Sequence, residues 1–320
     1  MDTTTPTGAA FAVHDDAFLD VLGPVPRLAR VIATDAHEGP VYVADEDALY
    51  FTTVPRPGFD GPVVDIRRLA LHTGTLATVR ADANAANGMA LAPDGRLLVC
   101  EQGSMARRAR VTRIDRPSGA AEALVEAVGG RPLNSPNDVV VARDGAVWFT
   151  DPSYGHLQGF RPPPASGEVV YRYDPATGDV EVVADGFDKP NGLAFSPDER
   201  TLYVGDSGAI HAPGDYDPQR PRQVVAFDVV DGRRVERRRP FGKPVPGFPD
   251  GLKVDAAGRV YVSCTAGVRV LGADGRLLGE IAVPGAAVNF TFGGPGRDVL
   301  LITADDAIWA AHLQATGPQP

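Results

Sequence analysis

Short apolar runs with polar residues between them dominate the chain, and glycine, proline and aspartate separate one run from the next. Examples are AVWFT (146–150), GLAFS (192–196), TLYVG (201–205) and VLLIT (299–303). Runs of this length between turn residues are typical of β-strands, and apolar residues at helical spacing are almost absent. The pattern predicts an all-β fold.

One two-strand phrase recurs six times along the chain. Each copy begins with a residue that carries a side-chain oxygen, continues into an apolar strand, turns seven positions later and returns in a second strand. The first residues of the copies, called anchors below, are Glu38, Asn87, Asn137, Asn191, Asp250 and Asn289. Their turn positions are Asp45, Asp94, Asp144, Asp198, Ala257 and Gly296. Successive anchors lie 49, 50, 54, 59 and 39 residues apart, which predicts a six-bladed β-propeller.

The two ends of the repeat predict how the ring closes. RLARVIA (27–33) precedes the first anchor and has no blade of its own, so we expect it to form an outer strand beside AIWAAHL (307–313). Residues 27–313 are therefore predicted to form the propeller. We expect residues 1–26 to be a partly ordered N-terminal extension and residues 314–320 to be a C-terminal tail.

The shared register of the anchors predicts a common site. In a propeller the first strand of each blade lines the central channel, so six anchors that begin these strands meet at one mouth. The second strands return the chain to the same mouth, where they bring Glu101, Gln102, Asp151, Tyr154, Asp206 and Ser207. Asn and Asp at strand starts are often ordinary turn residues, but the same register in six copies favours a polar pocket.

The anchors include two carboxylates and four carboxamides, and this set predicts a metal site. Carboxylates packed together repel one another unless one stays protonated, and a bound dication removes the conflict. Ligands that are all oxygen suit hard cations, and Ca²⁺ is the first choice because it accepts irregular oxygen shells. Mg²⁺, Mn²⁺ and Zn²⁺ are the alternatives.

Several longer phrases resemble one known family. They are HEGPVYV (37–43), NSPNDVVVARDGAVWFTDPSYG (134–155), KPNGLAFSPDERTLYVGDS (189–207), FPDGLKVDAAGRVYVS (248–263) and VNFTFGGPGRDVLLITA (288–304). Over residues 27–313 the chain resembles the senescence marker protein/gluconolactonase family of regucalcin-like lactonases, in its bacterial form. The resemblance implies a six-bladed propeller, one axial divalent metal, and hydrolysis of sugar lactones or related esters.

The resemblance also implies roles for particular residues. Glu38, Asn191 and Asp250 match metal ligands of the family, and Asn137 matches an asparagine that contacts the metal or the substrate. Asp250 further matches the residue that acts as general base, or as nucleophile in related phosphofluoridases. Ser135 stands where animal members carry an arginine that grips substrate, so the animal substrate preference is not transferred.

These observations together predict a metal-dependent lactonase. The metal polarises the lactone carbonyl, and Asp250 is the catalytic general base. The predicted metal ligands are Glu38, Asn137, Asn191 and Asp250. The predicted substrate-binding residues are Asn87, Glu101, Asn137, Tyr154 and Asn289.

Three other functions fit the same phrases. One is a phosphotriesterase-type hydrolase on the same metal site, with Asp250 as nucleophile, which a wider and more apolar pocket would favour. A second is a non-catalytic propeller that serves as an interaction platform, which would not need polar side chains converging at the mouth. A third is a biosynthetic isomerase or cyclase on this fold. No GxSxG motif is present, so a Ser–His–Asp mechanism has no support.

Charge and cysteine content narrow the choice of partner and compartment. The net charge of −10 and pI near 5.1 argue against nucleic acid or an anionic membrane as partner, since both need a basic face. The one basic run, Arg233 to Arg239, is expected on a solvated outer strand or loop. Cys100 and Cys264 lie in strands of different blades, so we expect free buried thiols and a cytoplasmic protein. A monomer or weak homodimer with a small lactone substrate is predicted.

Two insertions and one histidine complete the sequence-based predictions. Segments 157–167 and 210–221 depart from the repeat on the anchor side, and they are candidates for a rim or lid over the site. His37 precedes Glu38, and strand alternation turns its side chain away from whatever Glu38 faces. We therefore expect His37 to support the site without binding a metal.

Overall fold

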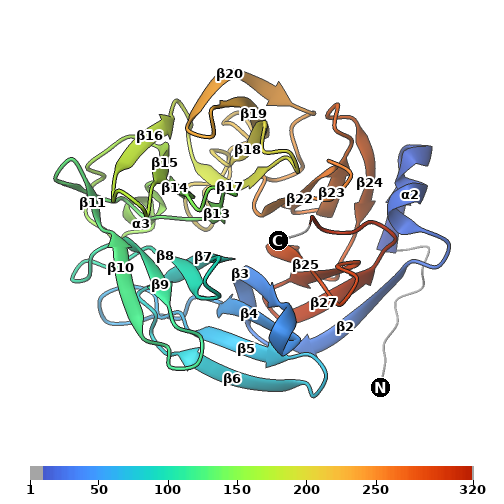
Figure 1. Cartoon of the computed structure of the whole chain (residues 1–320), viewed down its shortest axis with the longest axis horizontal. Coiled ribbons are helices and arrows are strands. Elements are labelled where there is room, and N and C mark those ends of the chain that lie inside the picture. Colours follow the sequence, from blue (N-terminus) through green and yellow to red (C-terminus); the bar gives the residue numbers. More distant parts are fainter. Residues whose placement is uncertain (1–9, 319–320) are drawn as a thin grey trace.

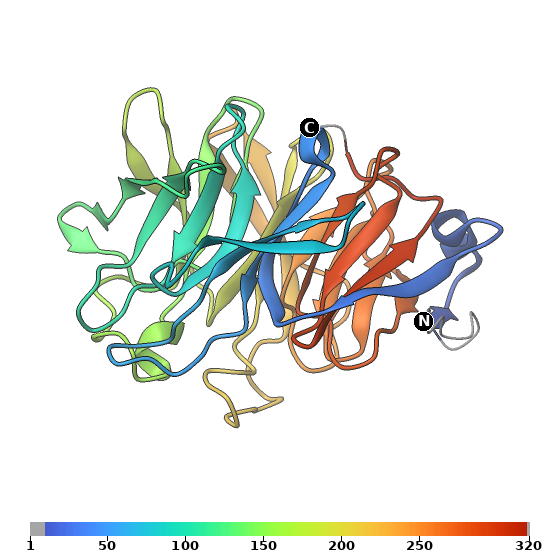
Figure 2. The same cartoon turned by 90° about the horizontal axis from the view of Figure 1, so that it is seen from below.

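The computed structural model describes residues 10–318, and within this range it confirms a six-bladed β-propeller (Figure 1). Six antiparallel sheets surround a central axis, and in each sheet the strand nearest the axis is the one that carries or follows an anchor. Figure 2 shows the ring from its edge, as a disc with loops on both faces.

The first four blades each consist of four strands in sequence order. Blade 1 comprises β3 (Ala36–Val43), β4 (Ala48–Thr53), β5 (Ile66–Ala70) and β6 (Thr75–Arg80). Blade 2 comprises β7 (Ala86–Leu91), β8 (Leu97–Glu101), β9 (Arg110–Ile114) and β10 (Ala121–Val125). Blade 3 comprises β13 (Val139–Val141), β14 (Val147–Asp151), β15 (Val169–Tyr173) and β16 (Val180–Ala184). Blade 4 comprises β17 (Pro190–Phe195), β18 (Thr201–Asp206), β19 (Gln223–Val230) and β20 (Arg234–Phe241).

The last two blades take strands from the N-terminal part of the chain. Blade 5 comprises β21 (Leu252–Val254), β22 (Val260–Cys264), β23 (Gly267–Leu271) and β24 (Leu277–Ile281), with β1 (Phe11–Val13) paired to the outer side of β24. Blade 6 comprises β25 (Asn289–Gly293), β26 (Val299–Thr303), β27 (Ala307–His312) and β2 (Arg27–Ala33). The antiparallel pairing of β2 with β27 confirms the predicted closure of the ring.

Short elements lie between the strands, some within a blade and some between blades. They are η1 (Asp16–Phe18), α2 (Leu19–Leu22), η2 (Ala44–Glu46), α3 (Tyr154–Leu157) and the small hairpin of β11 (Ala127–Val128) with β12 (Arg131–Pro132). No helix among residues 10–318 has the length and apolarity needed to cross a bilayer. Cys100 and Cys264 are buried free thiols, as predicted.

The hydrophobic core lies between the blades. Strand alternation sends side chains to the two neighbouring blades in turn. In β14, for example, Phe149 packs in the cluster shared with blade 2, whereas Trp148 packs in the cluster shared with blade 4. The same holds around the ring, so each blade is held by apolar contact with both of its neighbours.

Two features of the chain ends were not predicted. Beyond β1, Phe18 and Val21 are buried against blades 5 and 6, so part of the N-terminal extension completes the core. Residues 314–318 cross the face that carries the turn tips, where Ala256 N donates to Thr316 O and Gly317 N donates to Arg297 O. Whether residues 27–313 fold alone stays a prediction.

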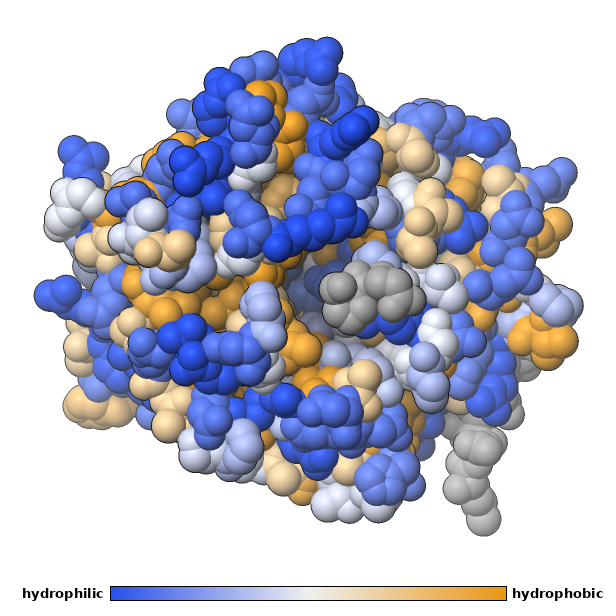
Figure 3. Space-filling view, in the orientation of Figure 1, coloured by the Kyte–Doolittle hydropathy of each residue, from blue (hydrophilic) through white to orange (hydrophobic). Residues whose placement is uncertain are grey.

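The two faces of the disc differ. In Figure 2 the C-terminal end lies on one face and the short helix α3 lies on the other, which is the anchor face. Figure 3 shows the face opposite the anchors, where hydrophilic side chains cover most of the rim. The basic run begins with Arg233 in the turn before β20 and continues on β20, an exposed outer strand, as predicted; Arg239 pairs there with Asp228 at 2.7 Å.

Candidate functional site

Backbone hydrogen bonds join the anchors of neighbouring blades. Gly88 N donates to Asn137 O at 2.8 Å, and Gly192 N donates to Asp250 O at 3.1 Å. The Asn87 side chain adds a second bond to Asn137 O, at 3.1 Å. These bonds link blade 2 to blade 3 and blade 4 to blade 5 at the mouth of the channel.

Side chains add two further links between blades. Thr150 Oγ1 donates to Asn191 O at 2.9 Å, which links blade 3 to blade 4. Asn289 Nδ2 donates to Glu38 Oε2 at 2.7 Å, which joins the last blade to the first. The structure therefore brings the predicted anchors together at one end of the axis.

Glycine after the anchor is what permits this close approach. A Cβ on Gly192 would stand 2.2 Å from Asp250 O, and a Cβ on Gly251 would stand 2.2 Å from Asn289 Oδ1. Gly39 combines a left-handed φ of 56° with a similar crowding by Asn87 O. The repeated anchor–glycine pair thus reflects a packing requirement, because only a residue without Cβ lets the next blade come this near.

Glu38 and Asp250 are the two carboxyl groups at the centre of the site. Burial raises the pKa of Glu38 to about 8, and the neighbouring Asp250 charge adds to this effect. Burial likewise raises the pKa of Asp250 to about 7, against hydrogen bonds from Asn191 and Glu38 that lower it. Without a cation the pair retains a proton near neutral pH.

The predicted metal ligands form a donor set that fits a hard divalent cation. Glu38 and Asp250 supply carboxylate oxygens, Asn137 and Asn191 supply carboxamide oxygens, and a cation would relieve the raised pKa of both acids. Within residues 10–318 no cluster of three or more His, Cys, Asp or Glu side chains is arranged to hold a metal. Glu38 and Asp250 are thus the two acidic ligands of the proposed set, and a cation bound there would also need the carboxamide oxygens of Asn137 and Asn191.

Glu38 is oriented by its neighbours. Its Oε2 accepts from Gly39 N at 3.0 Å as well as from Asn289. Asn289 Oδ1 accepts from Phe290 N at 2.7 Å, so both polar ends of the Asn289 side chain are occupied inside the ring. Asn289, which was predicted to contact substrate, is placed to hold Glu38.

Tyr154 belongs to the same group. It begins α3, and its buried hydroxyl approaches the side chains of Asn191 and Ser207. Within the described residues no hydrogen bond of good geometry satisfies this hydroxyl. Burial holds its pKa well above the usual range, so the hydroxyl stays a donor at neutral pH.

Glu101 is not part of this group. It is fully buried, and its oxygens accept from Asn84 Nδ2 at 2.9 Å, Arg110 Nε at 2.7 Å and Thr112 Oγ1 at 2.9 Å. All of these partners belong to blade 2 or to the loop before it. These contacts satisfy both carboxylate oxygens of Glu101, so the carboxylate needs no hydrogen bond from a substrate in the channel.

The acids that end β14 and β18 hold the loops before the anchors. Asp151 accepts from Asn134 N and Ser135 N, at 2.9 and 2.8 Å. Asp206 accepts in the same way from the two residues before Pro190, at 3.0 and 2.9 Å. These carboxylates fix the path of the chain into the site.

His37 Nδ1 lies 2.6 Å from Asp305 Oδ1, and its supporting role at the site stays a prediction. Asp138 was missed by the sequence analysis. Its Oδ1 accepts from Val139 N at 2.9 Å, whereas its buried Oδ2 has no partner within the described residues. A signal was present, because four of the other five anchors are followed by glycine and Asn137 is followed by an acid.

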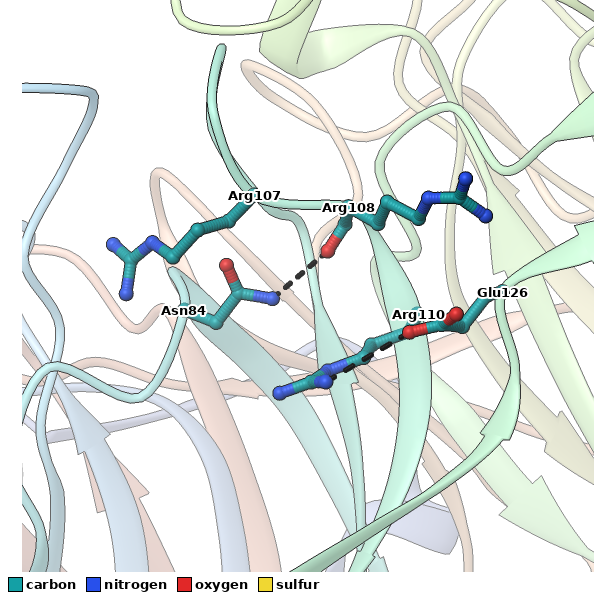
Figure 4. A pocket seen from close by; sticks show the side chains of 5 residues that line it. All are labelled: Asn84, Arg107, Arg108, Arg110 and Glu126. Carbon is teal, nitrogen blue, oxygen red and sulfur yellow. Dashed lines mark hydrogen bonds and ion pairs between the residues drawn. The ribbon is translucent and has the colours of Figure 1, made fainter.

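Two cavities open near these residues. The larger, about 570 Å³, is lined by Asn87 and Gln102 and by parts of both rim segments, namely Leu157, Gln158, Phe160, Ala212 and Pro213. The smaller, about 250 Å³, lies beside blade 2 and is lined by Asn84, Arg107, Arg108, Arg110 and Glu126 (Figure 4). None of the anchors lines the smaller one, and the guanidinium groups of Arg107 and Arg108 point apart in it.

The fold and the site together define a class of protein: a six-bladed propeller whose blades contribute one acid–amide cluster at the axis. Residues 36–306 match the family described as the SMP-30/Gluconolactonase/LRE-like region. The chain belongs to this family.

Named relatives support the same assignment. A gluconolactonase of Zymomonas mobilis is 29% identical over 93% of this chain and 84% of its own length. A pentonolactonase of Haloferax volcanii is 30% identical over 86% of this chain and 84% of its own length. Among solved structures, a gluconolactonase from Xanthomonas campestris is 34% identical, with a TM-score of 0.81 and 95% coverage of both chains.

Proposed function

We propose that this lactonase opens sugar lactones at the axial cluster, with the help of one divalent cation, Ca²⁺ by preference. Relatives named gluconolactonase and pentonolactonase support the lactone class. The observation that carries the proposal is the convergence of Glu38 and Asp250, each with a raised pKa, among carboxamides of the other blades. A cation held by Glu38, Asn137, Asn191 and Asp250 would supply Lewis-acid polarisation of the lactone carbonyl.

Asp250 is the best placed residue to act as general base. Asp250 is half-buried as a residue, whereas Glu38 is almost fully buried and its Oε2 is held by Gly39 and Asn289. A bound cation would favour the ionised carboxylate of Asp250, which is the form that accepts a proton. Asp250 accepts a proton from the water that attacks the carbonyl carbon, and it returns this proton to the ring oxygen, which leaves as the hydroxyl of the product acid when the ring C–O bond breaks.

Tyr154 and Asn87 are the residues that remain free to contact substrate. The Tyr154 hydroxyl is a donor without a good acceptor, next to Asn191. The Asn87 side chain lines the larger cavity and keeps its oxygen available, because only its amide nitrogen is bonded within the ring. We propose that they orient the lactone by its hydroxyl or ring oxygens.

One observation favours a second function. Proline, alanine, valine, leucine and phenylalanine side chains contribute much of the lining of the larger cavity, and an apolar mouth suits a phosphotriester. An interaction platform is disfavoured, because a scaffold needs no polar side chains converging on the axis. The compartment and the oligomeric state stay predictions.

The first experiment is a panel of sugar lactones and phosphotriesters with a pH indicator as readout. Each substrate is tested after chelation and after adding back Ca²⁺, Mg²⁺, Mn²⁺ or Zn²⁺. We expect sugar-lactone hydrolysis that stops on chelation and returns with metal. If only phosphotriesters are hydrolysed, the second function is correct and the proposed one is wrong. If full activity remains after chelation, the reaction does not depend on a metal.

A pair of isosteric variants separates the base from the metal ligand. Asp250→Asn keeps an oxygen for the cation and removes the base, so turnover should fall roughly 10²–10⁴-fold at any metal concentration. Glu38→Gln should weaken metal affinity, so excess metal should restore much of the rate. The reverse pattern would exchange the two roles.

A further inference from the structure

The larger cavity begins at the anchor Asn87, whose side chain bonds to Asn137 O, and extends outward between three loops. Its inner end is formed by Asn87, an anchor, and by Gln102, which follows β8. Its walls come from residues 55–64, from rim segment 157–167 and from rim segment 210–221. A volume of about 570 Å³ lies within the usual range of small-molecule sites.

The walls of this cavity are mostly apolar. Pro57, Val64, Leu157, Phe160 and Pro213 are among the residues that line it. A sugar hydroxyl placed against such a wall would lose its hydrogen bonds to water without replacing them.

The one charged residue of the lining does not change this character. Arg56 Nη2 lies 2.8 Å from Asp65 Oδ2, so its charge is already paired. The uncharged polar groups, Asn87 and Gln102, sit at the inner end, and Gln158 lies on the exposed rim segment. Polarity is thus concentrated near the axis.

The apolar wall is built on a fixed support. Arg161, next to Phe160, is buried and donates to Ser104 O and Arg107 O at 2.9 Å, and to Leu133 O and Asn134 O at 3.1 Å. Phe160 N and Arg161 N both donate to Gly155 O at 2.9 Å. The segment is therefore held in place before any ligand arrives, which lowers the entropy cost of binding.

We propose that this cavity binds an apolar substituent of the substrate, so that a lactone ring with an alkyl or aryl chain next to it is cut with a higher kcat/KM than the same ring without the chain. The inference rests on the proposed function, because the lactone carbonyl must lie at the Glu38–Asp250 pair. The polar inner end holds the ring oxygens, and the chain lies along Leu157, Phe160 and Pro213.

A homologous series of γ-alkyl-γ-butyrolactones tests the proposal. Each methylene that becomes fully buried should raise kcat/KM roughly fourfold, and partial burial should give about twofold. We expect a rise over the first methylenes and a plateau when the cavity is filled. Equal kcat/KM values along the series would overturn the proposal.

Two phenylalanines provide a matched pair of variants. Phe160→Ala removes part of the wall and should lower the ratio of kcat/KM between long-chain and unsubstituted lactones. Phe59→Ala is the control, because Phe59 lies within the wall segment 55–64 but is fully exposed and does not itself line the cavity. Leu157→Ala repeats the test at a partly exposed position where misfolding is less of a risk. An unchanged ratio in both wall variants, with native melting temperatures, would refute the assignment.

Glucono-δ-lactone, measured alongside, keeps the two proposals apart. If it is hydrolysed and the alkyl series is flat, only the subsite is wrong. If no lactone of either kind is hydrolysed at any metal condition, the proposed function itself fails.

Discussion

Replacing Gly192 by alanine tests how far the site depends on the close contact between blades 4 and 5. The added Cβ would stand 2.2 Å from Asp250 O and 2.9 Å from Leu252 N. To reach an ordinary contact distance, the backbone at Asp250 must retreat by roughly 1 Å. Gly192 does not have a left-handed φ, so the change tests packing and not backbone strain.

Both stability and activity should respond to this change. Forcing one methyl group into a filled contact costs about 1–3 kcal/mol of unfolding free energy. A displacement of Asp250 by about 1 Å misplaces the general base, and errors of that size lower turnover by roughly 10²-fold. The loss of activity should therefore be much larger than the loss of folded protein explains.

The assay is sugar-lactone hydrolysis at saturating metal, with thermal unfolding measured on the same samples. Gly167→Ala is the matched control, because the nearest atom to its added Cβ is a Val169 methyl at 3.8 Å and its φ is also not left-handed. The control should keep wild-type activity and stability. Wild-type turnover in Gly192→Ala would refute the idea that the tight contact positions Asp250.

Three further changes test other parts of the structure. Burial raises the pKa of Asp151 to about 7, above its value in the unfolded chain, so its contribution to stability is greatest at acid pH and falls as the pH rises through 7. In urea unfolding, Asp151→Asn should make the free energy of unfolding less dependent on pH between pH 5 and 8. An unchanged pH dependence would contradict the raised pKa of Asp151. Arg161→Met should lower the free energy of unfolding by roughly 3 kcal/mol or more, because buried carbonyls lose their hydrogen-bond donors. Arg161→Lys should recover only part of that loss. Equal free energies of unfolding for the wild type and both variants would count against this role of Arg161. Phe18→Ala should lower the melting temperature, because the cavity it leaves reduces the free energy of unfolding by about 3–5 kcal/mol. The variant should keep its kcat, since Phe18 packs on Gly279 at the outer edge of blade 5, and a lower kcat would contradict this prediction.

The ring and its closure could be predicted from the sequence because they follow from period and register. The anchor fixes where each first strand begins, and the alternation of residues such as Trp148 and Phe149 fixes which neighbour each side chain meets. The apolar run at 27–33 needs a strand to pair with, and it pairs with the outer edge of β27. The fifth strand β1 could not be predicted, since three residues carry no repeat signal.

The candidate site was harder to predict in detail, because side-chain direction depends on neighbours from other blades. Glu101 stands at the expected height, but Arg110 and Thr112 draw its carboxylate into blade 2. Asn289 bonds to Glu38 across the seam between the last blade and the first, a contact between residues 251 positions apart. Pairings of this kind are set by tertiary packing and leave no local pattern in the sequence.

The seam between β2 and β27 also determines when the protein can become functional during its synthesis. Arg27 and His312, which face each other there, are 285 residues apart. At translation rates of about 5–20 residues per second, β2 waits roughly 15–60 s for its partner, with the apolar side chain of Leu28 uncovered. The contact between Glu38 of blade 1 and Asn289 of blade 6 also has to wait for the last blade. The nascent chain therefore carries five nearly complete blades before its axial cluster exists, and the cluster is assembled last.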